Sequence, residues 1–177
     1  MTVIVLGILV SMVATRFHGD LRQRRDLFAV RIDSVLETLA FRQQLGQSRI
    51  ALTWDGDRRS LILERLYRES VDDESPEWRR DLLVREVVFD DPEIQVTGIR
   101  FDGESIDLSR FVRWEIPLDA VRPAIEIEMT WGKNTDLFQL LPYDGKPIRY
   151  GLGLEAPDGG DLEPIDLDDV GRGDESW

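Results

Sequence analysis

The side chains that most often carry out catalysis or hold metals are scarce in this chain. It contains no cysteine and a single histidine, His18, so thiolate chemistry is excluded and a histidine-based metal or triad site would lack nearby partners. The serines lie outside the strand–turn–helix context of a nucleophile elbow, and Gly151-Leu152-Gly153 lacks the rest of a dinucleotide-binding fingerprint. The sequence therefore predicts a protein that is not an enzyme and that holds no cofactor and no metal.

Clustered carboxylates are the remaining candidates for binding an ion. Asp72-Asp73-Glu74 and Asp90-Asp91 offer the oxygen ligands that hard cations prefer, but neither has the ligand spacing of a calcium loop, and we interpret both as solvated turns. The formal net charge is −13, and residues 155–177 hold nine acidic residues and one arginine, or −8 of that total. An acidic chain is a poor nucleic-acid binder. We expect 155–177 to form an acidic disordered tail.

The most informative predicted element is a helix that begins near Met1. Residues 2–14 are thirteen apolar or small residues, Arg16 ends the run, and no proline occurs before Pro76. One helix over 2–45 would be roughly 65 Å long at 1.5 Å per residue. The apolar run is shorter than the roughly 20 residues of a bilayer crossing. A signal-peptide core would need a preceding basic segment, and a buried soluble helix would need a core all round it. We favour a membrane segment that begins upstream of Met1.

The rest of this helix, 16–45, has an amphipathic pattern, whereas 2–15 is the predicted membrane and filament-core part. Apolar residues return at helical spacing, and charged residues fill the opposite face. The apolar positions are Leu21, Leu27, Phe28, Ile32, Val35, Leu36 and Leu39, and the charged ones are Arg22, Arg24, Arg25, Asp26, Arg31, Asp33 and Glu37. We expect the apolar face to cover a sheet, and Gly46 to end the helix as a left-handed cap.

Beyond residue 47 the hydrophobic period changes to that of β-strands. Six or seven short strands are expected, at 50–54, 61–67, 82–89, 94–101, 124–131, 137–141 and 147–152, with a hairpin turn at Asp55-Gly56-Asp57. The expected core anchors are aromatic: Trp54, Phe89, Phe101, Phe111, Trp114, Trp131 and Phe138. The predicted fold class is α+β, with a long N-terminal helix (1–46) packed on an antiparallel β-sheet head (47–154).

A family resemblance begins in the apolar run, which reads Val5-Leu6-Gly7-Ile8-Leu9-Val10-Ser11-Met12-Val13-Ala14-Thr15-Arg16-Phe17. This run resembles the second half of the N-terminal helix of type IV pilins and type II secretion pseudopilins. The Gly-Ile-Leu and Arg-Phe pieces fall at the family's spacing, and Thr15 stands where the family often has proline. The helix, polar link and hairpin are similar to H-type minor pseudopilins. The resemblance covers roughly residues 3–150, and its recognisable motifs lie in the N-terminal third.

The resemblance implies a pilin-like fold and a structural role in protein secretion. The chain would be a minor filament subunit of a type II secretion pseudopilus or a type IV pilus, held as a prepilin-type, single-pass protein in the bacterial inner membrane before assembly. Its partners would be inner-membrane lipid and other pilin or pseudopilin subunits. Nucleic acid is not expected to be a partner. The membrane and assembly residues would be Val3, Ile4, Val5, Leu6, Gly7, Ile8, Leu9, Val10, Met12 and Val13.

The orientation in the membrane is predicted differently by two arguments. Arg16, Arg22, Arg24 and Arg25 follow the apolar run, and the positive-inside rule would keep their side in the cytoplasm. The family places its head in the periplasm, and we follow the family. Two other classes remain open: a bitopic membrane-anchored β-rich binding module unrelated to filaments, and a soluble helix-plus-sheet domain.

The family's cleavage motif, a glycine before the cut and a glutamate five residues after it, does not occur in this sequence. We therefore expect the polypeptide to start upstream of Met1. The length deficit of the apolar run and the offset of the family alignment agree in size, which supports this expectation. Translation of the upstream reading frame would test it: a Gly-Phe-Thr-Leu-Ile-Glu-like stretch favours a filament subunit, and a stop codon favours an unprocessed relative.

Overall fold

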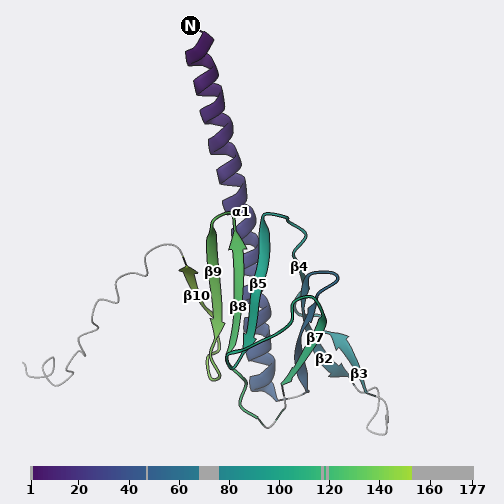
Figure 1. Cartoon of the computed structure of the whole chain (residues 1–177). Coiled ribbons are helices and arrows are strands. Elements are labelled where there is room, and N and C mark those ends of the chain that lie inside the picture. Colours follow the sequence, from purple (N-terminus) through teal and green to yellow (C-terminus); the bar gives the residue numbers. More distant parts are fainter. Residues whose placement is uncertain (1, 47, 68–75, 117, 119, 153–177) are drawn as a thin grey trace, which may run out of the picture.

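The computed structural model describes residues 2–46, 48–67, 76–116, 118 and 120–152, with the helix residues 2–20 described as backbone only. One helix, α1 (Thr2–Leu45), comes first, and ten strands follow it in the described part of the chain. Figure 1 shows the second half of α1 lying along two sheets, while its first half extends past them. The predicted α+β class, a helix packed on antiparallel sheet, is confirmed.

The buried face of α1 follows the predicted helical spacing. Its fully or almost fully buried residues are Phe28, Ala29, Ile32, Val35, Leu36, Leu39 and Ala40. The helix ends as expected, because Gly46 adopts φ +60° and donates its N–H to the carbonyl of Gln43 at 3.1 Å. The placement of Leu27 on this face is wrong. Leu27 lies on the side of the helix opposite the buried stripe, and 51% of it is exposed.

The first sheet is built on the predicted hairpin. Strands β1 (Ile50–Asp55) and β2 (Ser60–Tyr67) are antiparallel and are joined through the expected turn. The sheet order is β3-β2-β1-β7, where β3 is Glu77–Arg80 and β7 is Phe111–Ile116. A two-residue strand, β4 (Val87–Val88), also pairs with β2. The partner β7 therefore comes from far along the chain.

The second sheet has the order β10-β9-β8-β5-β6. Its strands are β5 (Ile94–Phe101), β6 (Glu104–Ser105), β8 (Ile125–Trp131), β9 (Asn134–Leu140) and β10 (Ile148–Leu152), all antiparallel. Strand β8 alternates as predicted: Ile125, Ile127 and Met129 are completely buried, and the residues between them are not. One core cluster joins the inner faces of both sheets to α1.

Three details of the predicted head are wrong. The strand over 82–89 is a loop up to Glu86, because Asp81 is held by the helix and Leu82 points outward with 96% of its surface exposed. Phe111 is 56% exposed on β7, since Val112, Trp114 and Ile116 form the strand's inner face and alternation turns Phe111 outward. Ten described strands replace the expected six or seven, because β3, β6 and β7 were not predicted.

Candidate assembly helix

The predicted membrane and assembly residues, Val3 to Val10 together with Met12 and Val13, all lie in the first third of α1. The backbone is helical without interruption from Thr2 to Leu45, and Figure 1 shows this first part extending beyond the ends of β5 and β8. The side chains of these residues lie outside the described part of the structure, as does the side chain of His18. Among the residues that the structure does describe, no helix reaches the combination of length and hydropathy needed to cross a membrane.

The second part of α1 is attached to the head first by aromatic packing. The ring of Phe28 stacks on Phe89 with centroids 5.4 Å apart, and Trp54 packs against the same Phe89 ring at 5.9 Å. Phe89 follows β4, and Trp54 belongs to β1, so the helix contacts two segments of the first sheet through one aromatic cluster. Burial of these rings contributes to the attachment together with the aliphatic residues of the buried stripe.

An ion pair joins the helix to the second sheet. Arg25 donates two hydrogen bonds to Asp136 of β9, from Nε at 2.7 Å and from the terminal nitrogen at 2.6 Å. Asp136 is buried and also accepts a hydrogen bond from Arg149 of β10 at 3.3 Å. The hydrogen bond that Arg25 donates to Asp136 raises the pKa of Arg25, against the lowering effect of burial. The guanidinium of Arg25 also lies 4.8 Å from the ring centre of Trp131.

A second ion pair holds the C-terminal end of the helix. Arg42 donates to both carboxylate oxygens of Asp81, at 2.6 and 2.9 Å, and the backbone N–H of Leu83 donates to the same carboxylate at 2.8 Å. Burial acts to raise the pKa of Asp81, but the hydrogen bonds from Arg42 and from Leu83 outweigh it, so this pKa lies below its ordinary value. This pair fixes the start of the loop that precedes β4.

A third contact uses Arg24, which pairs with Asp91 and with Glu93 just before β5. Together the three arginines hold the helix at points spread over about five turns, because Arg24 and Arg42 are 18 residues apart. The sequence prediction that Arg24 and Arg25 fill the solvent face is therefore wrong for these two residues. Their positions beside the buried stripe could have indicated contacts with the head, although the acidic partners could not be identified from the sequence.

The outward face of the helix carries exposed apolar residues. Leu27, Val30, Phe41 and Leu45 are between 42 and 64% exposed. They recur at helical spacing, so they lie on one side of α1, opposite the buried stripe. Leu27 and Leu45 are 18 residues apart, which is five turns at 3.6 residues per turn, and residue 9 precedes Leu27 by the same interval. One side of the helix thus connects the projecting part with the attached part. We call these four residues the outward stripe.

The acidic clusters and the glycine motif that the sequence offered as candidate binding residues form no site in the described structure. Asp91 is engaged by Arg24, and Asp72-Asp73-Glu74, Gly153 and the predicted tail 155–177 lie outside the described residues. Within the described ranges, no group of three or more His, Asp or Glu side chains is placed to hold a metal ion. The arrangement that stands out is therefore the long helix with its buried stripe and its outward stripe.

Comparisons with known proteins do not assign the chain to a family. No family model, no curated protein and no solved structure matches the chain.

Proposed function

We propose that the chain is a pilin-like structural subunit, a minor component of a type II secretion pseudopilus or a type IV pilus. In this proposal the helix holds the protein in the bacterial inner membrane before assembly, and the head lies in the periplasm. The single observation that carries the proposal is the uninterrupted helix from Thr2 to Leu45, of which one half is attached to the head and the other half extends beyond it.

The distribution of apolar residues supports an assembly role. A helix that only covers a sheet needs one apolar face, and the buried stripe of α1 already supplies it. The outward stripe adds exposed apolar residues on the other side of the same helix, with the exposed polar residue Ser34 between them, and neighbouring helices in a filament would cover it. The attachment of the helix to the head by Arg25 and Arg42 would let the two move from membrane to filament as one body.

The alternative is a membrane-anchored β-rich binding module unrelated to filaments. It requires the projecting helix but assigns no use to the outward stripe. The two functions therefore differ in what a charge on that stripe should do. In a filament subunit the charge should prevent assembly, and in an anchored module it should have no effect on function.

The proposed test is genetic complementation in the protein's native cells. Deletion of the gene should abolish secretion or piliation, and the wild-type chain should restore it. Val30→Glu, on the outward stripe, should fail to restore it, whereas the matched variant Ser105→Glu, at an exposed position of β6, should restore it fully. Equal restoration by both variants, with equal protein levels, would favour the anchored module.

A topology measurement tests the membrane part of the proposal separately. A reporter that is active only in the periplasm, fused after Gly153, should give signal, and a cytoplasm-specific reporter at the same position should give none. The opposite pattern would mean that the arginines after the apolar run set the orientation, as the positive-inside rule states.

A further inference from the structure

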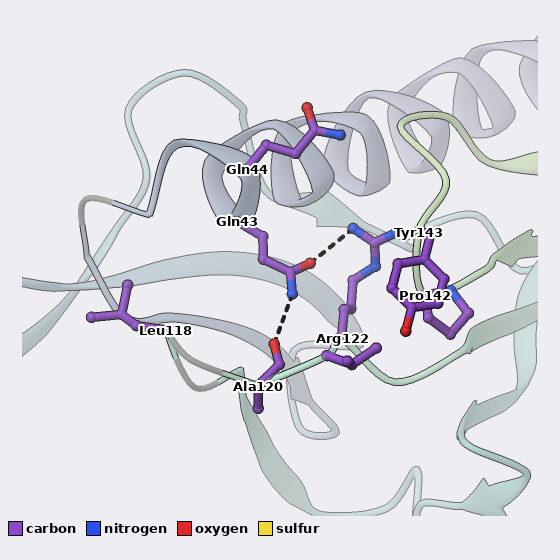
Figure 2. Close-up of a pocket in the computed structure, with 8 residues that line it drawn as sticks. Gln43, Gln44, Leu118, Ala120, Arg122, Pro142 and Tyr143 are labelled. Carbon is purple, nitrogen blue, oxygen red and sulfur yellow. Dashed lines mark hydrogen bonds between the residues drawn. The ribbon is translucent and has the colours of Figure 1, made fainter.

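A pocket of about 430 Å³ opens where the C-terminal end of α1 meets the head. Its wall on the helix side is formed by Gln43 and Gln44. The other walls come from the connection between β7 and β8, which includes Arg122, and from Pro142 and Tyr143 between β9 and β10. Figure 2 shows the side chain of Gln43 reaching from the helix to Arg122 and to the backbone of Ala120. This pocket is separate from the outward stripe.

Arg122 is the unusual group in this pocket, because it is a cation that is only 2% exposed. It donates from one terminal nitrogen to the side-chain oxygen of Gln43 at 3.0 Å, and from the other to the backbone carbonyls of Leu141 and Asp144. Its Nε is buried and has no hydrogen-bond partner among the described residues. Every oxygen that Arg122 contacts there is neutral.

A buried guanidinium normally has a carboxylate partner. The helix arginines follow this rule, since Arg25 and Arg42 each bind a buried aspartate. Arg122 forms no ion pair with any described residue, and Asp144, whose charge acts on its pKa, contacts it through the backbone oxygen. Burial lowers the pKa of Arg122, and the negative charge of Asp144 offsets this only in part. The folded chain therefore holds a positive charge that its described residues do not neutralise by contact.

The rim of the pocket is apolar and accessible. Leu118, Val121 and Tyr143 are all exposed, Tyr143 by 82%. Two donors retain hydrogen-bonding capacity there: the Nε of Arg122 and the amide nitrogen of Gln43, whose bond to the carbonyl of Ala120 is long at 3.3 Å. The side chains of Gln44 and Tyr143, which can donate or accept, also line the pocket. None of the residues that line the pocket is acidic, although the whole chain has a net charge of −13. Such a pocket favours an anion that carries an apolar neighbour.

We propose that this pocket binds a carboxylate side chain from a short acidic peptide segment of a partner protein, with Arg122 as its counter-charge. The side-chain amide of Gln43 would give up its 3.3 Å bond to Ala120 and its 3.0 Å bond from Arg122 to admit the carboxylate, which would replace it as the acceptor, and the rim would hold an adjacent apolar side chain. The volume suits a few side chains rather than a folded surface. This proposal does not depend on the filament function.

The test uses the full ¹⁵N-labelled chain in detergent micelles and nuclear magnetic resonance. The probe is the peptide acetyl-Leu-Glu-Leu-amide, and the matched neutral peptide is acetyl-Leu-Gln-Leu-amide. The charged peptide should shift the signals of the Arg122 Nε–H and the Gln43 side-chain amide in a saturable way, with an affinity at least about tenfold higher than that of the neutral peptide. Equal binding of the two peptides, or no saturable shift, would overturn the proposal. If acetate binds with the same affinity as the charged peptide, the assignment of the pocket to a peptide is overturned.

Variants of the pocket residues test directly whether Arg122 lacks a carboxylate partner. Gln43→Glu would place a carboxylate beside Arg122, so it should raise the unfolding temperature and abolish binding of the charged peptide. Gln23→Glu, the control on the same helix, should leave the unfolding temperature and the binding unchanged, because Gln23 is exposed and does not line the pocket. Tyr143→Ala should weaken binding severalfold without affecting folding. A Gln43→Glu variant that is less stable than wild type, or that binds the charged peptide normally, would contradict the proposal.

Discussion

Replacing Arg42 by methionine should reveal how strongly the ion pairs hold the helix to the head. The variant keeps the apolar stem of the side chain but leaves the carboxylate of Asp81, which is 0% exposed, without its cation. Removing one partner of a buried ion pair costs about 3–5 kcal/mol. The N–H of Leu83 would still donate to Asp81, so we expect the lower end, about 3 kcal/mol. That loss corresponds to a fall of roughly 6–12 °C in unfolding temperature for a chain of this size.

The pH dependence of this loss gives a second, independent check. In the wild type the pKa of folded Asp81 is lowered, so its contribution to stability is present above the unfolded pKa of about 3.9 and is lost as the pH falls through the folded pKa. Without Arg42, burial dominates and should raise the pKa of Asp81. The folded variant is then penalised at neutral pH and recovers as the carboxylate is protonated. The difference between wild type and variant should therefore shrink on acidification.

The assay is urea unfolding of the full chain in mild detergent, followed by tryptophan fluorescence at neutral pH and near pH 4. The matched control is Arg49→Met, because Arg49 pairs with Glu115 at the surface with side chains 48 and 40% exposed. An exposed pair of this kind contributes at most about 1 kcal/mol. Equal losses for the two variants, or an Arg42→Met loss that does not change with pH, would refute the reasoning.

The remaining predictions concern stability and use the same unfolding measurement. Gly56→Ala should cost about 2 kcal/mol, because a Cβ there would lie 2.6 Å from the backbone of a neighbouring loop. Phe28→Ala, which removes the ring stacked on Phe89, should cost about 3–4 kcal/mol, whereas the exposed neighbour change Leu27→Ala should cost less than about 1 kcal/mol. Removal of residues 157–177 should change stability by less than about 1 kcal/mol; a larger loss would mean that this segment docks on the sheets.

Local sequence patterns correctly predicted the elements that depend only on residues close together in the sequence. The helix end at Gly46, the hairpin after Trp54 and the alternation of β8 depend on short-range spacing, and the structure has all three. The pattern of β7 was also present, because Val112, Trp114 and Ile116 alternate. No strand was predicted there, and Phe111 and Trp114 were both expected in the core, although residues three apart on a strand face opposite sides.

The long-range contacts could not be predicted in the same way. Arg42 and Asp81 are separated by 39 positions, and Arg25 and Asp136 by 111. Any of the many acidic residues could have been the partner until the sheet order was known. The buried charge of Arg122 was equally hidden, since its burial results from the helix end and two loops meeting there. The sequence indicated the long helix but not how it is attached.

The most direct test of an assembly role is a crosslink from the outward stripe in living cells. A photoreactive amino acid at Val30, which is 64% exposed, should form a covalent adduct with another subunit that has an N-terminal apolar helix, and mass spectrometry would identify it. The same group at Glu104, exposed on β6, is the control and should not form that adduct. Adducts with helical subunits at Val30 alone are the predicted result. No adduct at Val30, or the same adducts from both positions, would contradict the filament account.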